Sequence, residues 1–265
     1  MKPGSSVTFA SETIWMRKTQ SVINLSLLAV IVSGWAYLIY QHWLMTSMPM
    51  SEMWMPPSDA SAWKLVDFGL VYLMWAAMMA AMMLPSAMPM ILAFSRISHK
   101  RYPAPQKINF IFAAAYLLVW LIFSVVLAVL QWQLHGLHVI SPMMDTKSEH
   151  LAAVIFLVAG TYQLTPLKNS LLQYCRSPAG FLLNEWRDGA KGAFRMGLKH
   201  GSTCVGCCWA QMLIMLAVGV MNLLGMAFVT LVILLEKIAP VKSQHICKAS
   251  GILFMGWGLW LLQAG

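Results

Sequence analysis

The sequence contains few charged residues. Asp, Glu, Lys and Arg make up 10% of its 265 residues, whereas 59% are hydrophobic. A soluble domain has about 25% charged residues, so this composition excludes an ordinary soluble protein and predicts an integral membrane protein. Acidic residues are scarcer than basic ones, 9 against 18, which gives a formal net charge of +9.

The sequence also lacks the usual catalytic and secretory signatures. It has no P-loop, dinucleotide-binding fingerprint or nucleophile elbow, so whether it is an enzyme stays open. Its cysteines number five and are clustered, which argues against a secreted disulfide framework. The apolar run 22–40 exceeds the core of a signal peptide, about 7–15 residues, and no small-x-small cleavage site follows it. We therefore expect this run to stay in place as the first transmembrane helix.

Long apolar segments set the expected fold. A spanning helix needs about 20 apolar residues, and six segments meet or approach this length: 22–44, 67–95, 108–134, 150–166, 204–235 and 246–264. We predict an all-α, polytopic membrane helix bundle of about six transmembrane helices that forms one domain, 1–265. The long segment 204–235 is expected to be one tilted helix. The basic segment 167–203 is expected to contain a surface amphipathic helix over 181–198.

The distribution of cationic residues orients this bundle. With the N-terminus in the cytoplasm, most Lys and Arg fall on cytoplasmic segments, as the positive-inside rule requires. The outer segments then hold Lys64, Lys147, Lys237, Lys242 and Lys248. We expect a multi-pass protein of the cell inner membrane whose basic charge contacts anionic lipid rather than nucleic acid.

Three cysteines lie within five residues at the start of the run 204–235. Cys204, Cys207 and Cys208 are spaced i, i+3 and i+4, so on a helix their side chains share one face. Thiolates suit a soft metal such as Cu(I), or thiol redox chemistry. Cys175 or His200 is available as a further ligand, whereas the paired spacing of a zinc site is missing. The alternative is that these small side chains only pack.

Methionines form a second soft-ligand pattern. Met74, Met78 and Met82 repeat at i+4 in the run 67–95, which places their thioethers on one helix face. Such a face can line a path for Cu(I). Packing is the alternative, because the intervening alanines also favour close contact between helices.

On the expected outer side, the loop 45–55 carries five methionines, and His135 and His138 are spaced i, i+3. These residues can capture a metal, or can simply anchor the membrane surface. Three polar positions complete the predictions. Glu236 and Lys237 are interpreted as a structural charge pair at a span end, and Asn222 as a hydrogen bond between helices.

Several motifs resemble the DUF2182 family of predicted metal-binding integral membrane proteins, over about residues 67–264. The similar stretches are Met78–Ser86, Tyr162–Lys168, Cys175–Pro178, Gly206–Met212, Gly219–Leu223 and the pair Glu236–Lys237. The resemblance implies metal binding without a stated reaction. In that family a further cysteine often precedes the Cys-Arg pair, where this chain has Ser170, and this departure argues against a zinc site made only of cysteines.

Together these patterns favour a membrane protein of metal homeostasis that binds copper and delivers or transports it. The predicted metal ligands are Cys204, Cys207, Cys208, Cys175, Met78, Met82, His135 and His138. The expected partners are the lipid bilayer, a metal-donor or acceptor protein, and a second copy of the chain. The alternatives are a copper-dependent or thiol-redox membrane enzyme subunit and a scaffold subunit without metal.

Overall fold

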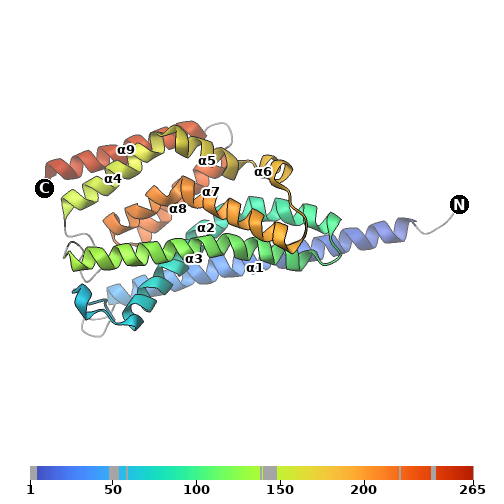
Figure 1. Cartoon of the computed structure of the whole chain (residues 1–265), viewed down its shortest axis with the longest axis horizontal. Helices are drawn as coiled ribbons and strands as arrows, with labels where there is room; N and C mark the ends of the chain where they lie inside the picture. The colour runs from blue at the N-terminus through green and yellow to red at the C-terminus, as the bar shows by residue number, and fades with distance from the viewer. Residues whose placement is uncertain are drawn as a thin grey trace.

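The computed structural model describes residues 5–47, 54–57, 59–137, 139, 148–220, 222–239 and 243–264. Within these ranges every regular element is a helix (Figure 1). The elements are α1 (Ser5–Ser47), the short 3₁₀ helix η2 (Ala60–Ala62), α2 (Leu65–Arg101), α3 (Pro105–Gly136), α4 (Glu149–Leu164), α5 (Pro166–Arg176), α6 (Pro178–Glu185), α7 (Gly189–Val218), α8 (Leu223–Ile238) and α9 (Ser243–Ala264).

Five of these helices contain stretches long and apolar enough to cross a membrane: Leu25–Ser47, Leu65–Arg101, Pro105–Gly136, Gly189–Val218 and Gln244–Gln263. The consecutive helices α4 and α5 pass the same test as a pair but are bent by 68°, which allows up to six spans. Pro166 begins α5, and the Thr165 hydroxyl caps it by accepting a hydrogen bond from the Lys168 backbone N–H. The predicted all-α membrane helix bundle is confirmed.

The run 204–235 is not one helix, which corrects the prediction. It divides into the end of α7 and most of α8, with a break at 219–222. Gly219 has a φ of 99°, a conformation that favours glycine. Asn222 then caps α8 by accepting a hydrogen bond from the Gly225 backbone N–H. The Asn222 side chain also donates a hydrogen bond to the carbonyl oxygen of Val218, the last residue of α7, at 3.4 Å. It therefore links two consecutive helices, as expected, but from the turn between them and not from the middle of a span.

The chain reverses its direction after the break in this run. α8 returns along the bundle, and the two termini lie at opposite ends of the molecule (Figure 1). Lys248 of α9 lies beside Thr165 and Pro166 in a pocket of about 200 Å³. This position is on the side that the charge count gave to the cytoplasm. Lys248 and the start of α5, which were expected on opposite sides of the membrane, therefore lie together.

Close backbone contact joins α4 and α9, which lie side by side in Figure 1. A Cβ atom built on Gly160 would lie 2.8 Å from the Gly251 carbonyl oxygen and 2.8 Å from the Met255 backbone nitrogen. Glycine at this position therefore allows the two helices to approach closely.

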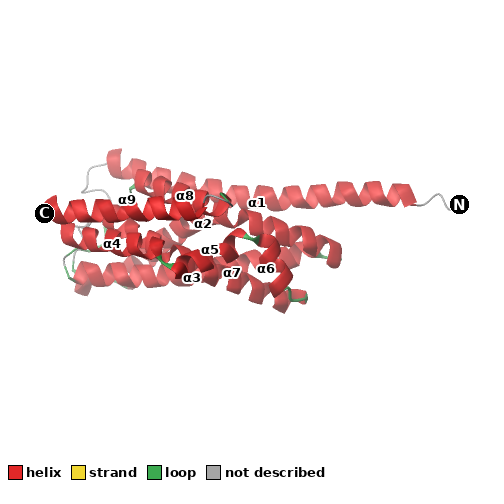
Figure 2. Ribbon diagram, turned by 90° about the horizontal axis from the view of Figure 1, so that it is seen from above, coloured by secondary structure: helices red, strands yellow, loops and turns green. Residues whose placement is uncertain are grey.

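The segment expected as a surface helix over 181–198 is instead divided between α6 and the start of α7. Phe181 and Leu182 of α6 are buried, so this region folds against the bundle rather than lying freely on a membrane surface. α1 extends beyond the other helices toward the N-terminus (Figure 2).

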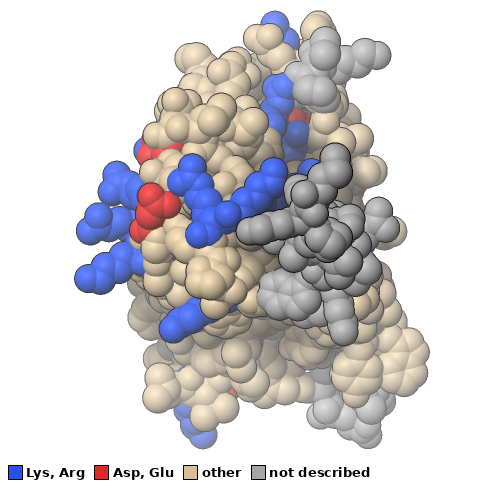
Figure 3. Space-filling model, turned by 90° about the vertical axis from the view of Figure 1, so that its right-hand side faces the viewer, with Lys and Arg blue, Asp and Glu red and all other residues tan. Residues whose placement is uncertain are grey.

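Lys and Arg side chains gather at the end of the molecule that faces the viewer in Figure 3. At this end α2 finishes and α3 and α7 begin (Figure 1). The exposed cations of these segments are Arg96, Lys100, Arg101, Lys107, Arg187, Lys191, Arg195 and Lys199.

Candidate metal centre

Three cysteines from two helices converge inside the bundle. The sulfur atoms of Cys175 on α5 and of Cys204 and Cys207 on α7 all lie within 4.8 Å of one another. The Cys175 and Cys207 sulfurs are 3.8 Å apart. All three side chains are buried, and Cys204 and Cys207 are 0% exposed. We call these residues the thiol centre.

Cys208 lies beside the thiol centre without belonging to it. Its sulfur is 3.2 Å from that of Cys207, but it is not part of the group in which all ligand atoms are mutually close. His200 is likewise outside this group. Within the described part of the chain the thiol centre therefore offers three ligands. Such a set suits Cu(I), a soft ion, better than structural zinc, which almost always takes four.

A cation and a phenol contact the thiol centre from other helices. The Lys237 ammonium on α8 donates hydrogen bonds to the Cys204 sulfur at 3.0 Å and to the Ser86 hydroxyl oxygen on α2 at 2.9 Å. The Tyr116 hydroxyl on α3 is 3.3 Å from the Cys204 sulfur and also contacts the Met83 carbonyl oxygen at 3.3 Å. Helices α3 and α8 thus each place a polar group on the Cys204 sulfur, and the ammonium supplies a positive charge next to it.

A second buried polar network lies close to the thiol centre. The fully buried Lys168 on α5 pairs with Glu236 on α8 at 2.8 Å. Gln211 on α7 accepts a hydrogen bond from the Lys168 ammonium at 3.0 Å, and Gln163 on α4 donates one to the Glu236 carboxylate at 2.6 Å. A Ser250 hydroxyl on α9 completes this set. We call it the ion-pair network.

The pair Glu236–Lys237 differs from its interpretation from sequence. The two side chains do not form a local charge pair at a span end. Glu236 belongs to the ion-pair network, whereas Lys237 contacts the thiol centre. The sequence signal was present, because two ionisable residues at the end of an apolar run are unusual. Tyr116 and Ser86 carry no comparable signal in the sequence.

The structure separates the other predicted ligands. Met78 and Met82 on α2 are both 0% exposed, and Met82 precedes Ser86 by one helical turn. They therefore lie one and two turns before Ser86, the residue of α2 that contacts Lys237. Met48, Met50, Met53 and His138 lie outside the described residues.

His135 is far from the thiol centre. It follows Tyr116 by 19 residues on the same helix, or about 28 Å at 1.5 Å per residue. Its ring is fully buried, with Nδ1 2.9 Å from the Gln131 carbonyl oxygen and the ring centre 5.4 Å from that of Trp63. His135 and the cysteines are therefore separate sites on the chain.

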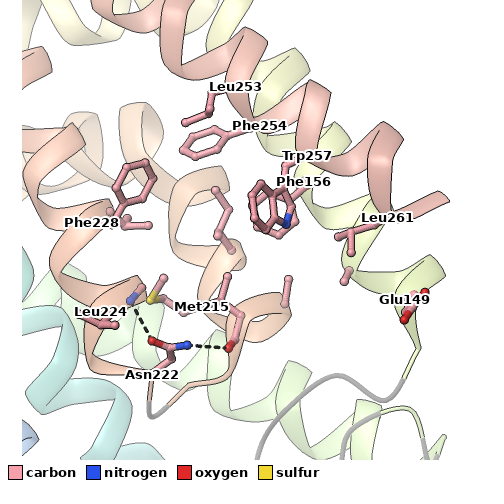
Figure 4. Close-up of a pocket in the computed structure, with 16 residues that line it drawn as sticks. Glu149, Phe156, Met215, Asn222, Leu224, Phe228, Leu253, Phe254, Trp257 and Leu261 are labelled. Atoms are coloured by element: carbon pink, nitrogen blue, oxygen red, sulfur yellow. Dashed lines mark hydrogen bonds between the residues drawn. The ribbon is translucent and has the colours of Figure 1, made fainter. Parts of the chain in front are cut away.

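An apolar cavity of about 690 Å³ lies between α4, α7, α8 and α9. Figure 4 shows Phe156, Phe228, Phe254 and Trp257 around it. Its lining includes one thioether, from Met215, and no thiol. The chemistry of a soft-metal site is therefore found at the thiol centre and not in this cavity.

The fold and the thiols define the class: an all-α membrane protein that holds a buried cluster of soft donor atoms. Comparison with known families specifies it further. The model of the family PpoB2, described as copper chaperone, matches residues 72–261, more than half of the chain. The chain belongs to this family, which confirms the predicted relation to copper. The curated proteins and the solved structures gave no match.

Proposed function

We propose that this protein is a membrane copper chaperone that binds Cu(I) as cargo at the thiol centre and hands it to a partner protein. The observation that carries the proposal is the convergence of three buried sulfurs within 4.8 Å from two different helices. The described copper-chaperone family supports copper as the cargo.

The donor set fits an ion that must be released again. Three thiolates bind Cu(I) without filling a fourth position, so an incoming ligand from a partner can add before one leaves. Cys208, 3.2 Å from Cys207, is placed to take part in this exchange. In this proposal Met78 and Met82 relay the ion along α2. His135, near the end of α3, captures the ion together with His138.

The basic end of the molecule sets the proposed orientation. Its exposed Lys and Arg residues (Figure 3) favour the cytoplasmic side of a membrane. We therefore place the N-terminus in the cytoplasm and the protein in a bacterial-type inner membrane, as one domain. The relation to the DUF2182 family is part of the same proposal, as is self-association through lipid-facing helices.

The test is the copper content of the full-length protein purified in detergent under reducing conditions. Wild type is expected to carry close to one copper per chain after competition with a strong Cu(I) chelator. The triple variant Cys175→Ser, Cys204→Ser and Cys207→Ser is expected to carry none.

Cys247→Ser is the matched control. Cys247 is also a buried free cysteine, but it lies on α9 and outside the thiol centre. Its replacement is expected to leave copper content unchanged. Wild type without copper after Cu(I) loading, or a triple variant that retains it, would contradict the proposal.

Thiol redox use is the second candidate, favoured by the 3.8 Å separation of the Cys175 and Cys207 sulfurs. Oxidation to a disulfide removes two electrons and two protons from this pair, which an added oxidant takes up, and brings the sulfurs to about 2.05 Å. Counting free thiols in the protein before and after exposure to a disulfide oxidant separates the two functions. Loss of two thiols in wild type but not in Cys175→Ser, together with absence of copper, would favour the redox function.

A further inference from the structure

Beyond the thiol centre, α7 carries a continuous row of soft donor atoms. Met196, His200, Cys204, Cys208 and Met212 repeat at i+4, so consecutive members lie next to each other on the helix surface, about 5–6 Å apart between Cβ atoms. All five are at most 2% exposed. The row therefore extends the thiol centre by two residues toward the start of α7.

His200 is unusual within this row. Its side chain is buried among the aromatic rings of Phe112, Tyr116 and Phe181, at ring-centre distances of 6.3, 5.3 and 5.6 Å. Neither ring nitrogen has a hydrogen-bond partner among the residues that the structure describes. Leaving a buried polar group unpaired is costly, so packing alone does not explain a histidine here.

The position of His200 connects it to the thiol centre. It precedes Cys204 by one turn, and the Tyr116 ring that stacks on it carries the hydroxyl that contacts the Cys204 sulfur at 3.3 Å. Imidazole nitrogen is a good copper ligand. A Cu(I) ion leaving the thiols would meet His200 next.

Met196 carries the row to a pocket at the basic end of the bundle. One turn before His200, it lines a pocket of about 130 Å³ together with Glu185, Arg187, Arg195 and Lys199. This pocket lies at the basic end of the bundle, where α7 begins. A thioether at its base is thus the first soft ligand that an ion or a partner's ligand would reach from this side.

We propose that His200 and Met196 form a second Cu(I) station, which joins the thiol centre to the pocket at Met196. The proposal rests on the proposed copper function and adds the route by which the cargo enters or leaves. The ion moves by exchange of ligands, from a Cys204 thiolate to the His200 imidazole and then to the Met196 thioether, without change of oxidation state.

The charges around the pocket indicate the form in which copper is exchanged. Arg187, Arg195 and Lys199 outnumber Glu185, which pairs with Lys199 at 2.5 Å. A free Cu(I) ion would be repelled by this excess of positive charge. A Cu(I) ion held by two thiolates has a net charge of −1, so the pocket favours a partner that presents copper on paired cysteines.

The test is a titration of the full-length protein with Cu(I) beyond the first equivalent, under anaerobic and reducing conditions, followed by copper X-ray absorption. Wild type is expected to bind a second equivalent of Cu(I) more weakly than the first. The absorption spectrum of this second copper is expected to show a nitrogen ligand. His200→Phe is expected to lose this equivalent and to keep the first, sulfur-bound one. Met196→Leu is expected to raise the Kd for the second Cu(I) ion at least 10-fold.

His99→Phe is the matched control. His99 on α2 also lacks a hydrogen-bond partner among the described residues, but Ser95 and Pro103, not Met or Cys, stand four residues away. This variant is expected to bind both equivalents. Retention of the first equivalent in His200→Phe shows that the thiol centre is still folded.

The outcomes separate this inference from the proposed function. If wild type binds only one Cu(I) ion, coordinated by sulfur, and His200→Phe binds the same, the second station is refuted and the thiol centre is not. A water molecule bound at His200 would give this same result. Absence of the first equivalent in wild type would instead contradict the proposed function.

Discussion

The contact between Lys237 and Cys204 gives the sharpest test of how this bundle stabilises a metal complex. Three thiolates with one Cu(I) ion have a net charge of −2, and the Lys237 ammonium, 3.0 Å from the Cys204 sulfur, offsets part of it. Lys237→Gln removes the charge and keeps a side chain able to donate a hydrogen bond to Ser86. We expect this variant to bind Cu(I) more weakly.

The size of the effect follows from the distance. Two unit charges 3.0 Å apart interact by about 5 kcal/mol at an effective dielectric constant of about 20. The glutamine amide can still donate a hydrogen bond to the thiolate, which restores part of this energy, so we take about 3 kcal/mol as the loss on substitution. A loss of about 3 kcal/mol corresponds to a rise of about 100-fold in Kd.

The assay is competition for Cu(I) with a coloured chelator at fixed pH, on wild type, Lys237→Gln and Lys237→Arg. The arginine variant keeps the positive charge and is expected to stay within about 10-fold of wild type. Thermal unfolding of each variant in detergent shows whether the bundle is intact. A folded Lys237→Gln protein with wild-type affinity would refute the electrostatic argument.

Three further changes test the packing that holds the site, each measured by thermal unfolding in detergent. Glu236→Gln leaves the buried Lys168 ammonium without its carboxylate and is expected to cost about 3–5 kcal/mol; an unchanged midpoint would show that the pair is not buried in the membrane protein. Gly160→Ala places a methyl group 2.8 Å from two α9 backbone atoms and is expected to cost about 1–3 kcal/mol, whereas Gly256→Ala, with nothing within 4 Å, is expected to be neutral; equal midpoints would refute the close contact. Gly219→Ala forces a φ of 99° on a residue with a Cβ and is expected to cost about 1–3 kcal/mol; an unchanged midpoint would show that the turn between α7 and α8 does not need glycine.

Local patterns predicted much of this structure from the sequence. The spans 67–95 and 108–134 were found because apolar length alone defines a membrane helix, and they correspond to α2 and α3. The shared face of Cys204 and Cys207 followed from helix periodicity. Cys175 can be a further ligand only if the segment that carries it packs against α7. This segment is α5, and the bend after α4 brings it there.

The missed features depend on the path of the chain. The break between α7 and α8 interrupts a run that is apolar on both sides of it, so apolar length alone does not reveal it, although Gly219 and Asn222 match the usual end and start of two helices. A single helix over 204–235 would place Lys237 at the outer surface. Its contact with Cys204 exists only because α8 turns back, so no pattern within 204–235 alone could reveal it.

The ion-pair network and the thiol centre are two levels of one interface between α5, α7 and α8. Lys168 and Cys175 are seven residues apart on α5, and Cys204 and Gln211 are seven residues apart on α7, so each pair lies on one helix face two turns apart. Glu236 and its neighbour Lys237 connect the two levels on α8. A buried charge tolerates little displacement from its partner, so the Lys168–Glu236 pair fixes the register of α5 and α8. That register brings the Cys175 sulfur to the thiols of α7. It gives a reason for a buried ion pair, with its desolvation cost, next to a site that must keep three soft ligands in place.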